Sequence, residues 1–141
     1  EHEFVEGLAP VEAAVHFAGF MTQGQVADLL AQSDMLVLPS FAEGLPVVYM
    51  EALASRIPVV ASRVAGVQEL VEDGVTGFAV PPGDVATLAD RMTRLMDDPA
   101  AARTMGEAGR KAVEAGFDIR REGARLAEIF LSGSPGGPLR P

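Results

Sequence analysis

The sequence predicts an α/β fold in which helices cover both faces of a parallel sheet. Four short runs of apolar residues alternate with segments of helical apolar spacing, and the runs lie at 15–19, 35–38, 57–61 and 77–80. Strands that are apolar along their whole length, with helices between them, are typical of parallel sheets. Ligands of such sheets bind beyond the carboxyl ends of the strands, often at the N-terminus of a helix.

In the first half of the chain, the expected strand at 15–19 ends at a glycine and precedes an expected helix at 22–32. The run Met35-Leu36-Val37-Leu38 carries no polar residue and predicts a buried strand. Pro46 is expected to be the first residue of a helix that reaches residue 56, because its missing N–H costs nothing there.

In the second half, the strand at 57–61 leads to a short helix between Gly66 and Gly74. The strand at 77–80 is stopped by two prolines, and Asp84 is then expected to be the N-cap of a helix that reaches about residue 96.

The C-terminal part is expected to hold two more helices, near 100–114 and 119–130, after a polar turn at Asp97-Asp98. Residues 132–141 consist mainly of Gly, Pro and Ser, which predicts a disordered tail after one domain at 1–131.

Composition narrows the class of protein. The chain has 141 residues, of which 48% are hydrophobic and 22% charged, and this suits one globular domain or part of one. Because cysteine is absent, disulfides, thiolate metal ligands and a cysteine nucleophile are excluded. The formal net charge of −9 disfavours nucleic acid as a partner, since binding it requires Lys and Arg against phosphates.

The sequence also bears on location. No apolar stretch approaches the roughly 20 residues that span a membrane, and no signal-peptide pattern opens the chain. A cytoplasmic location is therefore expected. The first residue is not methionine, which is compatible with a fragment of a longer protein.

Two glutamates, Glu43 and Glu51, are the candidates for a ligand site. Glu43 lies in the loop after the strand at 35–38, and Glu51 lies inside the helix that follows. Glu51 is the only charged residue between 44 and 55, and a carboxylate on a largely buried helix is costly unless it is hydrogen-bonded. A pair of ligand hydroxyls is one candidate partner.

The start of the same helix is a candidate anion site, because the amides of Val47 and Val48 would face a ligand with the helix dipole behind them. Structural roles are the alternatives for the two glutamates. Glu43 would then be a loop carboxylate favourable to the dipole, and Glu51 a buried carboxylate bonded to a backbone neighbour.

Seven segments follow one another in a distinctive order. They are Val15-His16-Phe17-Ala18-Gly19-Phe20, Ser33-Asp34 with the strand and Pro39-Ser40 after it, Glu43-Gly44-Leu45-Pro46-Val47-Val48 with Glu51-Ala52-Leu53-Ala54, Pro58-Val59-Val60-Ala61, Gly66-Val67-Gln68-Glu69-Leu70-Val71, Gly74-Val75-Thr76-Gly77-Phe78 and Pro81-Pro82-Gly83-Asp84. In this order they resemble the C-terminal, donor-binding domain of the retaining "group 1" (family 4) glycosyltransferases, which have the two-domain GT-B architecture. The resemblance runs from about Val15 to Phe130. The stretch at 61–66 looks most like exopolysaccharide and colanic-acid-type enzymes.

The resemblance implies a Rossmann-like parallel sheet with flanking helices, in an N-terminally truncated GT-B C-terminal domain. It implies transfer of a sugar from a nucleoside-diphosphate sugar to a carbohydrate or lipid-linked acceptor, with retention, in polysaccharide or glycolipid synthesis. Catalysis in the family is mainly positioning and charge stabilisation of the leaving diphosphate. No cofactor and no metal are expected, and peripheral membrane association of the full-length enzyme is left open.

The resemblance also assigns roles by position. Glu43 would be the catalytic residue that faces the donor-sugar hydroxyls, and Glu51 would bind the ribose hydroxyls. The residues expected to hold the sugar and diphosphate are Gly44, Leu45, Pro46, Val47 and Val48. The residues expected near the nucleobase are Gly19, Phe20 and Met21.

Two departures from the family pattern qualify these expectations. Family members have two further strand–helix units before the strand at 15–19, which carry a Gly-rich loop and a basic pair, and they have a separate acceptor domain. Nothing in this chain matches those parts. The alternatives are therefore a catalytically inactive nucleotide-sugar-binding fragment and a GT-B-type sugar-nucleotide epimerase. The isolated chain is expected to transfer no sugar.

The missing units also affect the expected sheet. The family strand order is 3-2-1-4-5-6, so this chain would supply strands three to six. The strand at 15–18 is then expected either to leave a gap with exposed apolar edges, which favours self-association, or to collapse onto the strand at 35–38.

Overall fold

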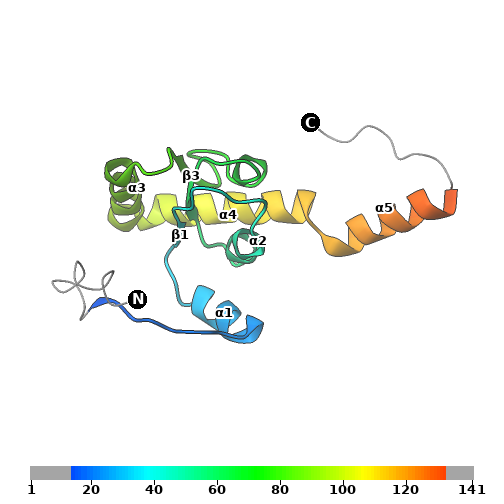
Figure 1. The fold of residues 1–141 in the computed structure, drawn as a ribbon, viewed down its shortest axis with the longest axis horizontal. Helices are drawn as coiled ribbons and strands as arrows, with labels where there is room; N and C mark the ends of the chain where they lie inside the picture. The colour runs from blue at the N-terminus through cyan, green and yellow to red at the C-terminus, as the bar shows by residue number, and fades with distance from the viewer. Residues whose placement is uncertain (1–13, 133–141) are drawn as a thin grey trace.

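A parallel sheet lies at the centre of the fold, which a computed structural model describes for residues 14–132 (Figure 1). The α/β class and the expected neighbour order of these strands are confirmed. The strands lie side by side in the order β1 (Leu36–Leu38), β2 (Val59–Ser62) and β3 (Gly77–Val80).

Helices cover the sheet or extend from it (Figure 1). Their bounds are α1 (Gln23–Leu30), α2 (Val47–Ala54), the 3-10 helix η3 (Val67–Glu69), α3 (Val85–Asp97), α4 (Pro99–Gly116) and α5 (Ile119–Ser132).

The two faces of the sheet carry separate apolar clusters, because alternate residues of a strand point to opposite sides. Val59 and Ala61 of β2 pack with α2 and η3, whereas Val60 packs with α3 and the beginning of α4. Helix α4 joins both clusters, with Met105 in the second and Val113 in the first.

Two aspartates cap helices of this body. The Asp84 carboxylate accepts the Thr87 amide at 2.9 Å, so the expected N-cap of α3 is confirmed. Asp98 was expected in a turn that ends a helix, and it also caps the next one, accepting the Ala101 amide at 2.9 Å. Helix α4 therefore follows α3 directly.

Helix α5 extends away from this body (Figure 1), and none of its residues is buried. Its apolar side chains Ile119 and Phe130 are 85% and 78% exposed. The helix ends at Ser132, and the remainder of the expected tail lies outside the described residues, so the domain boundary stays a prediction. Within residues 14–132, no helix combines the length and apolar character needed to cross a membrane.

The strand expected at 15–19 is not present. Val15 and Phe17 are 40% and 70% exposed, and the segment pairs with no described strand. A strand needs a hydrogen-bonded neighbour, and this segment has none within the described residues. Of the two expected outcomes, the structure shows the unfilled edge and not the collapse onto β1.

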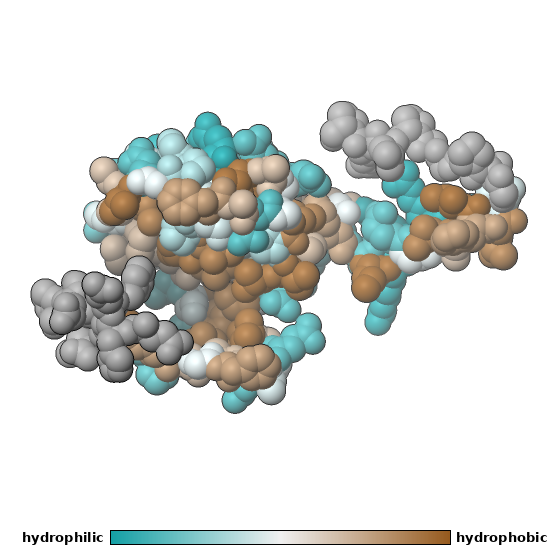
Figure 2. Space-filling view, in the orientation of Figure 1, coloured by the Kyte–Doolittle hydropathy of each residue, from teal (hydrophilic) through white to brown (hydrophobic). Residues whose placement is uncertain are grey.

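The two edges of the sheet differ in whether their outward-facing backbone groups are hydrogen-bonded. On β3 the outward Ala79 amide donates to Asp73 at 3.1 Å, and the Ala79 carbonyl accepts from Arg63 at 2.8 Å. On β1 the Leu36 amide donates inward to the Pro58 carbonyl, so the backbone amide and carbonyl of Val37 point outward. Neither group has a hydrogen-bond partner within residues 14–132. Figure 2 shows hydrophobic surface in the hollow between α1 and the sheet. Within the part of the chain that the structure describes, the β1 edge is therefore open to another strand, whereas Asp73 and Arg63 occupy the β3 edge at Ala79.

Self-association through the β1 edge is expected, because an unpaired apolar edge strand is a template for pairing. Sedimentation velocity of the chain should show an average mass that rises with concentration. Asp73→Ala removes the cap from β3 and should increase this association by adding a second open edge. Monomers at every concentration for both proteins would contradict the expectation.

Candidate functional site

The loops that follow β1 and β2 meet at the carboxyl edge of the sheet, where Gly66 lies against Gly44. A Cβ atom on Gly66 would stand 1.8 Å from the Gly44 carbonyl oxygen and 3.3 Å from the Leu45 amide nitrogen. Gly66 also has a φ of +81°, which residues with side chains rarely adopt. This close approach requires glycine, and it sets the position of the loop that carries Glu43.

Glu43 is half-buried, and its carboxylate is held from within its own loop. The Ser40 hydroxyl donates a 2.7 Å hydrogen bond to Glu43 Oε1. Tyr49, which is fully buried, donates from its hydroxyl to the Leu38 carbonyl at 3.4 Å. Burial and, second, the negative charge of Glu43 raise the pKa of Tyr49 to about 12. The Glu43 carboxylate and the Tyr49 phenol therefore interact electrostatically.

Helix α2 begins one residue later than expected, at Val47, because Pro46 is its N-cap and not its first helical residue. Pro46 keeps an extended ψ of 126°, and its carbonyl accepts the Tyr49 amide at 3.1 Å. The amides of Val47 and Val48 have no hydrogen-bond acceptor among residues 14–132. Free amides at a helix N-terminus suit an anion, so the role expected for Gly44–Val48 remains a prediction that this geometry favours.

Glu51 lies one turn further along α2, on the same face as Val47. It is half-buried, and Gln23 Nε2 donates a 3.3 Å hydrogen bond to Glu51 Oε1. Gln23 is the first residue of α1 and closely follows Gly19–Met21. Helix α1 therefore brings the end of that segment toward Glu51, with Phe20 98% exposed.

The predicted candidates thus form two groups, one around Glu43 in the loop before α2 and one around Glu51 in the middle of the helix. Residues that sequence reasoning did not predict complete them: Ser40, Tyr49, Gln23 and Gly66. A signal existed for Ser40, since a serine three residues from a carboxylate is spaced for a local side-chain hydrogen bond. No local signal predicts Gln23, whose contact depends on how α1 packs against α2.

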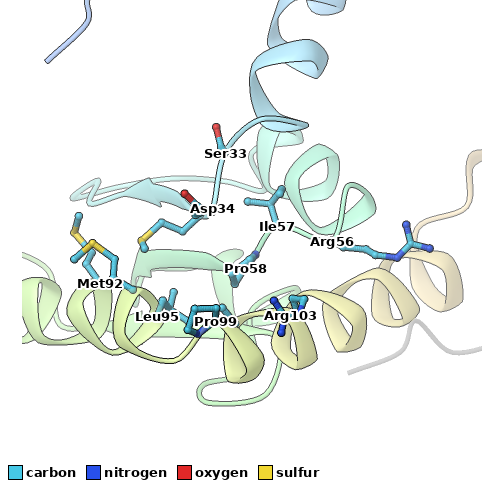
Figure 3. Close-up of a pocket in the computed structure, with 12 residues that line it drawn as sticks. Ser33, Asp34, Arg56, Ile57, Pro58, Met92, Leu95, Pro99 and Arg103 are labelled. Carbon is cyan, nitrogen blue, oxygen red and sulfur yellow. The ribbon is translucent and has the colours of Figure 1, made fainter. Parts of the chain in front are cut away.

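A pocket of about 700 Å³ lies elsewhere, at the amino ends of the strands (Figure 3). Its walls include Ser33 and Asp34 before β1, Pro58 before β2, Met92 of α3 and Arg103 of α4. This is the opposite edge of the sheet from Glu43, so the pocket is separate from the candidate site.

Metal binding finds no support in the part of the chain that the structure describes. No three His, Asp or Glu side chains gather there closely enough to hold an ion. The expectation of a metal-independent site stays a prediction.

Comparison with known proteins identifies the family of this chain. The sequence profile described as "Glycosyl transferases group 1" matches residues 8–112. The chain belongs to this family.

Two curated relatives illustrate the range of the group 1 glycosyltransferases. The chain is 36% identical, over 124 residues, to an alpha-D-kanosaminyltransferase of Streptomyces kanamyceticus, covering 88% of the chain and 32% of the relative. It is 36% identical, over 126 residues, to the amylovoran biosynthesis glycosyltransferase AmsK of Erwinia amylovora, covering 85% of the chain and 31% of the relative.

A solved structure agrees with this assignment. The structure of Anabaena HepE in complex with UDP superposes with a TM-score of 0.85 at 30% identity, covering 93% of this chain and 35% of that chain. The chain thus spans about a third of the length of the relatives that it matches.

The Gly66–Gly44 contact predicts a difference between two glycine substitutions. Gly66→Ala and Gly74→Ala both place alanine at a positive φ, of +81° and +79°, but only the first meets other atoms within 4 Å. Gly66→Ala should therefore unfold in urea with a free energy lower than that of Gly74→Ala by about 1–3 kcal/mol, the usual cost of overpacking.

Gly74→Ala is the matched control, because it isolates the cost of the backbone conformation. In NMR spectra, Gly66→Ala should also shift the amide resonances of 45–48, whereas Gly74→Ala should leave them in place. Equal stabilities and unchanged amide resonances for both variants would show that Gly66 does not set the position of this loop.

Proposed function

We propose that this chain is the donor-binding part of a retaining family 4 glycosyltransferase, which moves a sugar from a nucleoside-diphosphate sugar to a carbohydrate or lipid-linked acceptor. The single observation that carries the proposal is the arrangement along α2. Free amides lie at its start, a carboxylate held by Ser40 precedes it, and a second carboxylate lies one turn into it. The proposal includes a role in polysaccharide or glycolipid synthesis in the cytoplasm.

The diphosphate is assigned to the N-terminus of α2. The amides of Val47 and Val48 and the helix dipole would stabilise its negative charge there. Arg63 follows β2 in the chain, but its guanidinium is engaged with Ala79 and Asp73. Further positive charge at the diphosphate is therefore assigned to a segment outside residues 14–132. Charge stabilisation of the leaving group is the main catalytic contribution of such a site.

The hydroxyl groups of the donor are assigned to the two carboxylates. A carboxylate only accepts hydrogen bonds, so each suits a ligand rich in hydroxyl donors. Glu51 would bind the ribose, close to the Gly19–Met21 segment that is assigned to the nucleobase. Glu43 would bind the donor sugar next to the diphosphate.

A second candidate function is a binding module that holds nucleotide sugar without transferring it. The observation in its favour is that the chain spans about a third of the length of its relatives. Transfer is therefore proposed for the full-length protein, and nucleotide binding for this chain. Sugar-nucleotide epimerisation is the weaker alternative, because both curated relatives described above are named as transferases.

The assignment of Glu51 predicts a selective loss of nucleotide affinity. Glu51→Gln keeps the size of the side chain but removes the charge that would accept the ribose hydrogen bonds. Hydrogen bonds to charged groups contribute about 1.5–3 kcal/mol, so affinity should fall about 10-fold or more. Calorimetry with UDP, GDP and ADP, titrated in turn into the chain, measures the loss and identifies the preferred base.

Glu43→Gln should leave nucleotide affinity within about twofold and instead lower turnover by the full-length protein. Glu128→Gln, on the exposed helix α5, makes the same charge change away from the site and is the matched control. Equal affinity losses for Glu43→Gln and Glu51→Gln would refute the division of roles.

A further inference from the structure

The loop between β1 and α2 contains a hydrogen bond between Ser40 and Glu43 to which the proposed function assigns no role. Ser40 comes two residues after β1 ends, and its hydroxyl donates to Glu43 Oε1 at 2.7 Å. The other carboxylate oxygen, Oε2, has no hydrogen-bond partner within residues 14–132. One oxygen of Glu43 is therefore fixed by the protein, while the second is left for a ligand.

Tyr49 places a neutral hydroxyl next to the same carboxylate. Its side chain is 0% exposed, and its hydroxyl donates to the Leu38 carbonyl at 3.4 Å, at the end of β1. The Tyr49 proton is thus directed at the backbone and not at Glu43. Among residues 14–132, Ser40 is the only residue that donates a hydrogen bond to this carboxylate.

We propose that Ser40 is a positioning residue for Glu43: its hydroxyl holds one carboxylate oxygen so that the other faces a hydroxyl group of the donor sugar. This inference rests on the proposed function, since it concerns the donor site. The alternative is that Ser40 only closes a turn of the loop, in which case the orientation of the carboxylate would not depend on it.

The chain contains a reporter for the orientation of Glu43. Tyr49 is the only tyrosine, and tryptophan is absent. Labelling tyrosine with ¹³C at Cζ therefore gives one resonance, whose alkaline titration yields the pKa of Tyr49. The Glu43 charge contributes to the raised value of about 12, so displacement of the carboxylate lowers that pKa.

The experiment compares Ser40→Ala, which removes the hydroxyl, with Ser40→Thr, which retains it, and with Glu43→Gln, which removes the charge. Glu43→Gln should lower the pKa of Tyr49, while burial keeps it above its ordinary value. Ser40→Ala should lower it in the same direction, and Ser40→Thr should match the parent chain. If the pKa of Tyr49 in Ser40→Ala equals that of the parent chain, the proposal is overturned, whatever the function of the chain.

Turnover by the full-length protein tests the consequence. Ser40→Ala should lower kcat about tenfold, with nucleoside-diphosphate affinity within twofold, and Ser40→Thr should restore kcat. If Glu43→Gln is inactive while Ser40→Ala is fully active, the positioning role is overturned. If Glu43→Gln is itself fully active, the proposed function of Glu43 fails, and the Tyr49 resonance still shows whether Ser40 holds the carboxylate.

Discussion

The close contact between Gly66 and the Gly44 carbonyl is the constraint on which the arrangement of the site depends. It brings the loop after β2 against the loop after β1, at a distance that a single methyl group would prevent. With Gly44 held there, Pro46 can cap α2, and the first two amides of the helix have no acceptor within residues 14–132. The position of Glu43 follows from the same contact, because it precedes Gly44 directly.

Helix α2 also packs closely against α4. A Cβ atom on Gly109 of α4 would stand 2.5 Å from Leu53 of α2, and one on Gly106 would stand 2.0 Å from the Arg56 carbonyl that follows the helix. The two helices therefore pack with almost no space between them. A site built on a rigid element keeps its geometry better than one on loops alone. Helix α2 can thus hold Glu51 at a constant position relative to its own N-terminus, next to the loop that carries Glu43.

Elements governed by local chemistry could be predicted from the sequence. The short, uniformly apolar runs of β1, β2 and β3 indicate strands, although β1, at the open edge, is only half-buried whereas β2 and β3 are buried. The Asp84 cap depends on residues only three positions apart. The segment at 15–19 has the same apolar character, yet it forms no strand. Strand formation depends on a neighbour, and no pattern within the segment reveals whether one is present.

The candidate site was predictable in part for the same reason. The glutamates and the start of α2 could be singled out because their spacing and the surrounding motifs are sequence properties. The predicted start of α2 was one residue too early, because the fixed φ of proline suits an N-cap as well as the first helical position. The contacts of Tyr49 with Leu38 and of Gln23 with Glu51 join residues 11 and 28 positions apart, and such contacts depend on packing.

The central claim is that a nucleoside diphosphate binds at the N-terminus of α2, on the carboxyl edge of the sheet. Amide chemical-shift mapping of the ¹⁵N-labelled chain, with UDP or the base that calorimetry selects, tests it most directly. The account predicts that the largest shifts fall on Val47 and Val48, with smaller ones near Gln23 and Glu51. Largest shifts around Ser33, Asp34 and Arg103, in the pocket at the opposite edge, would contradict it.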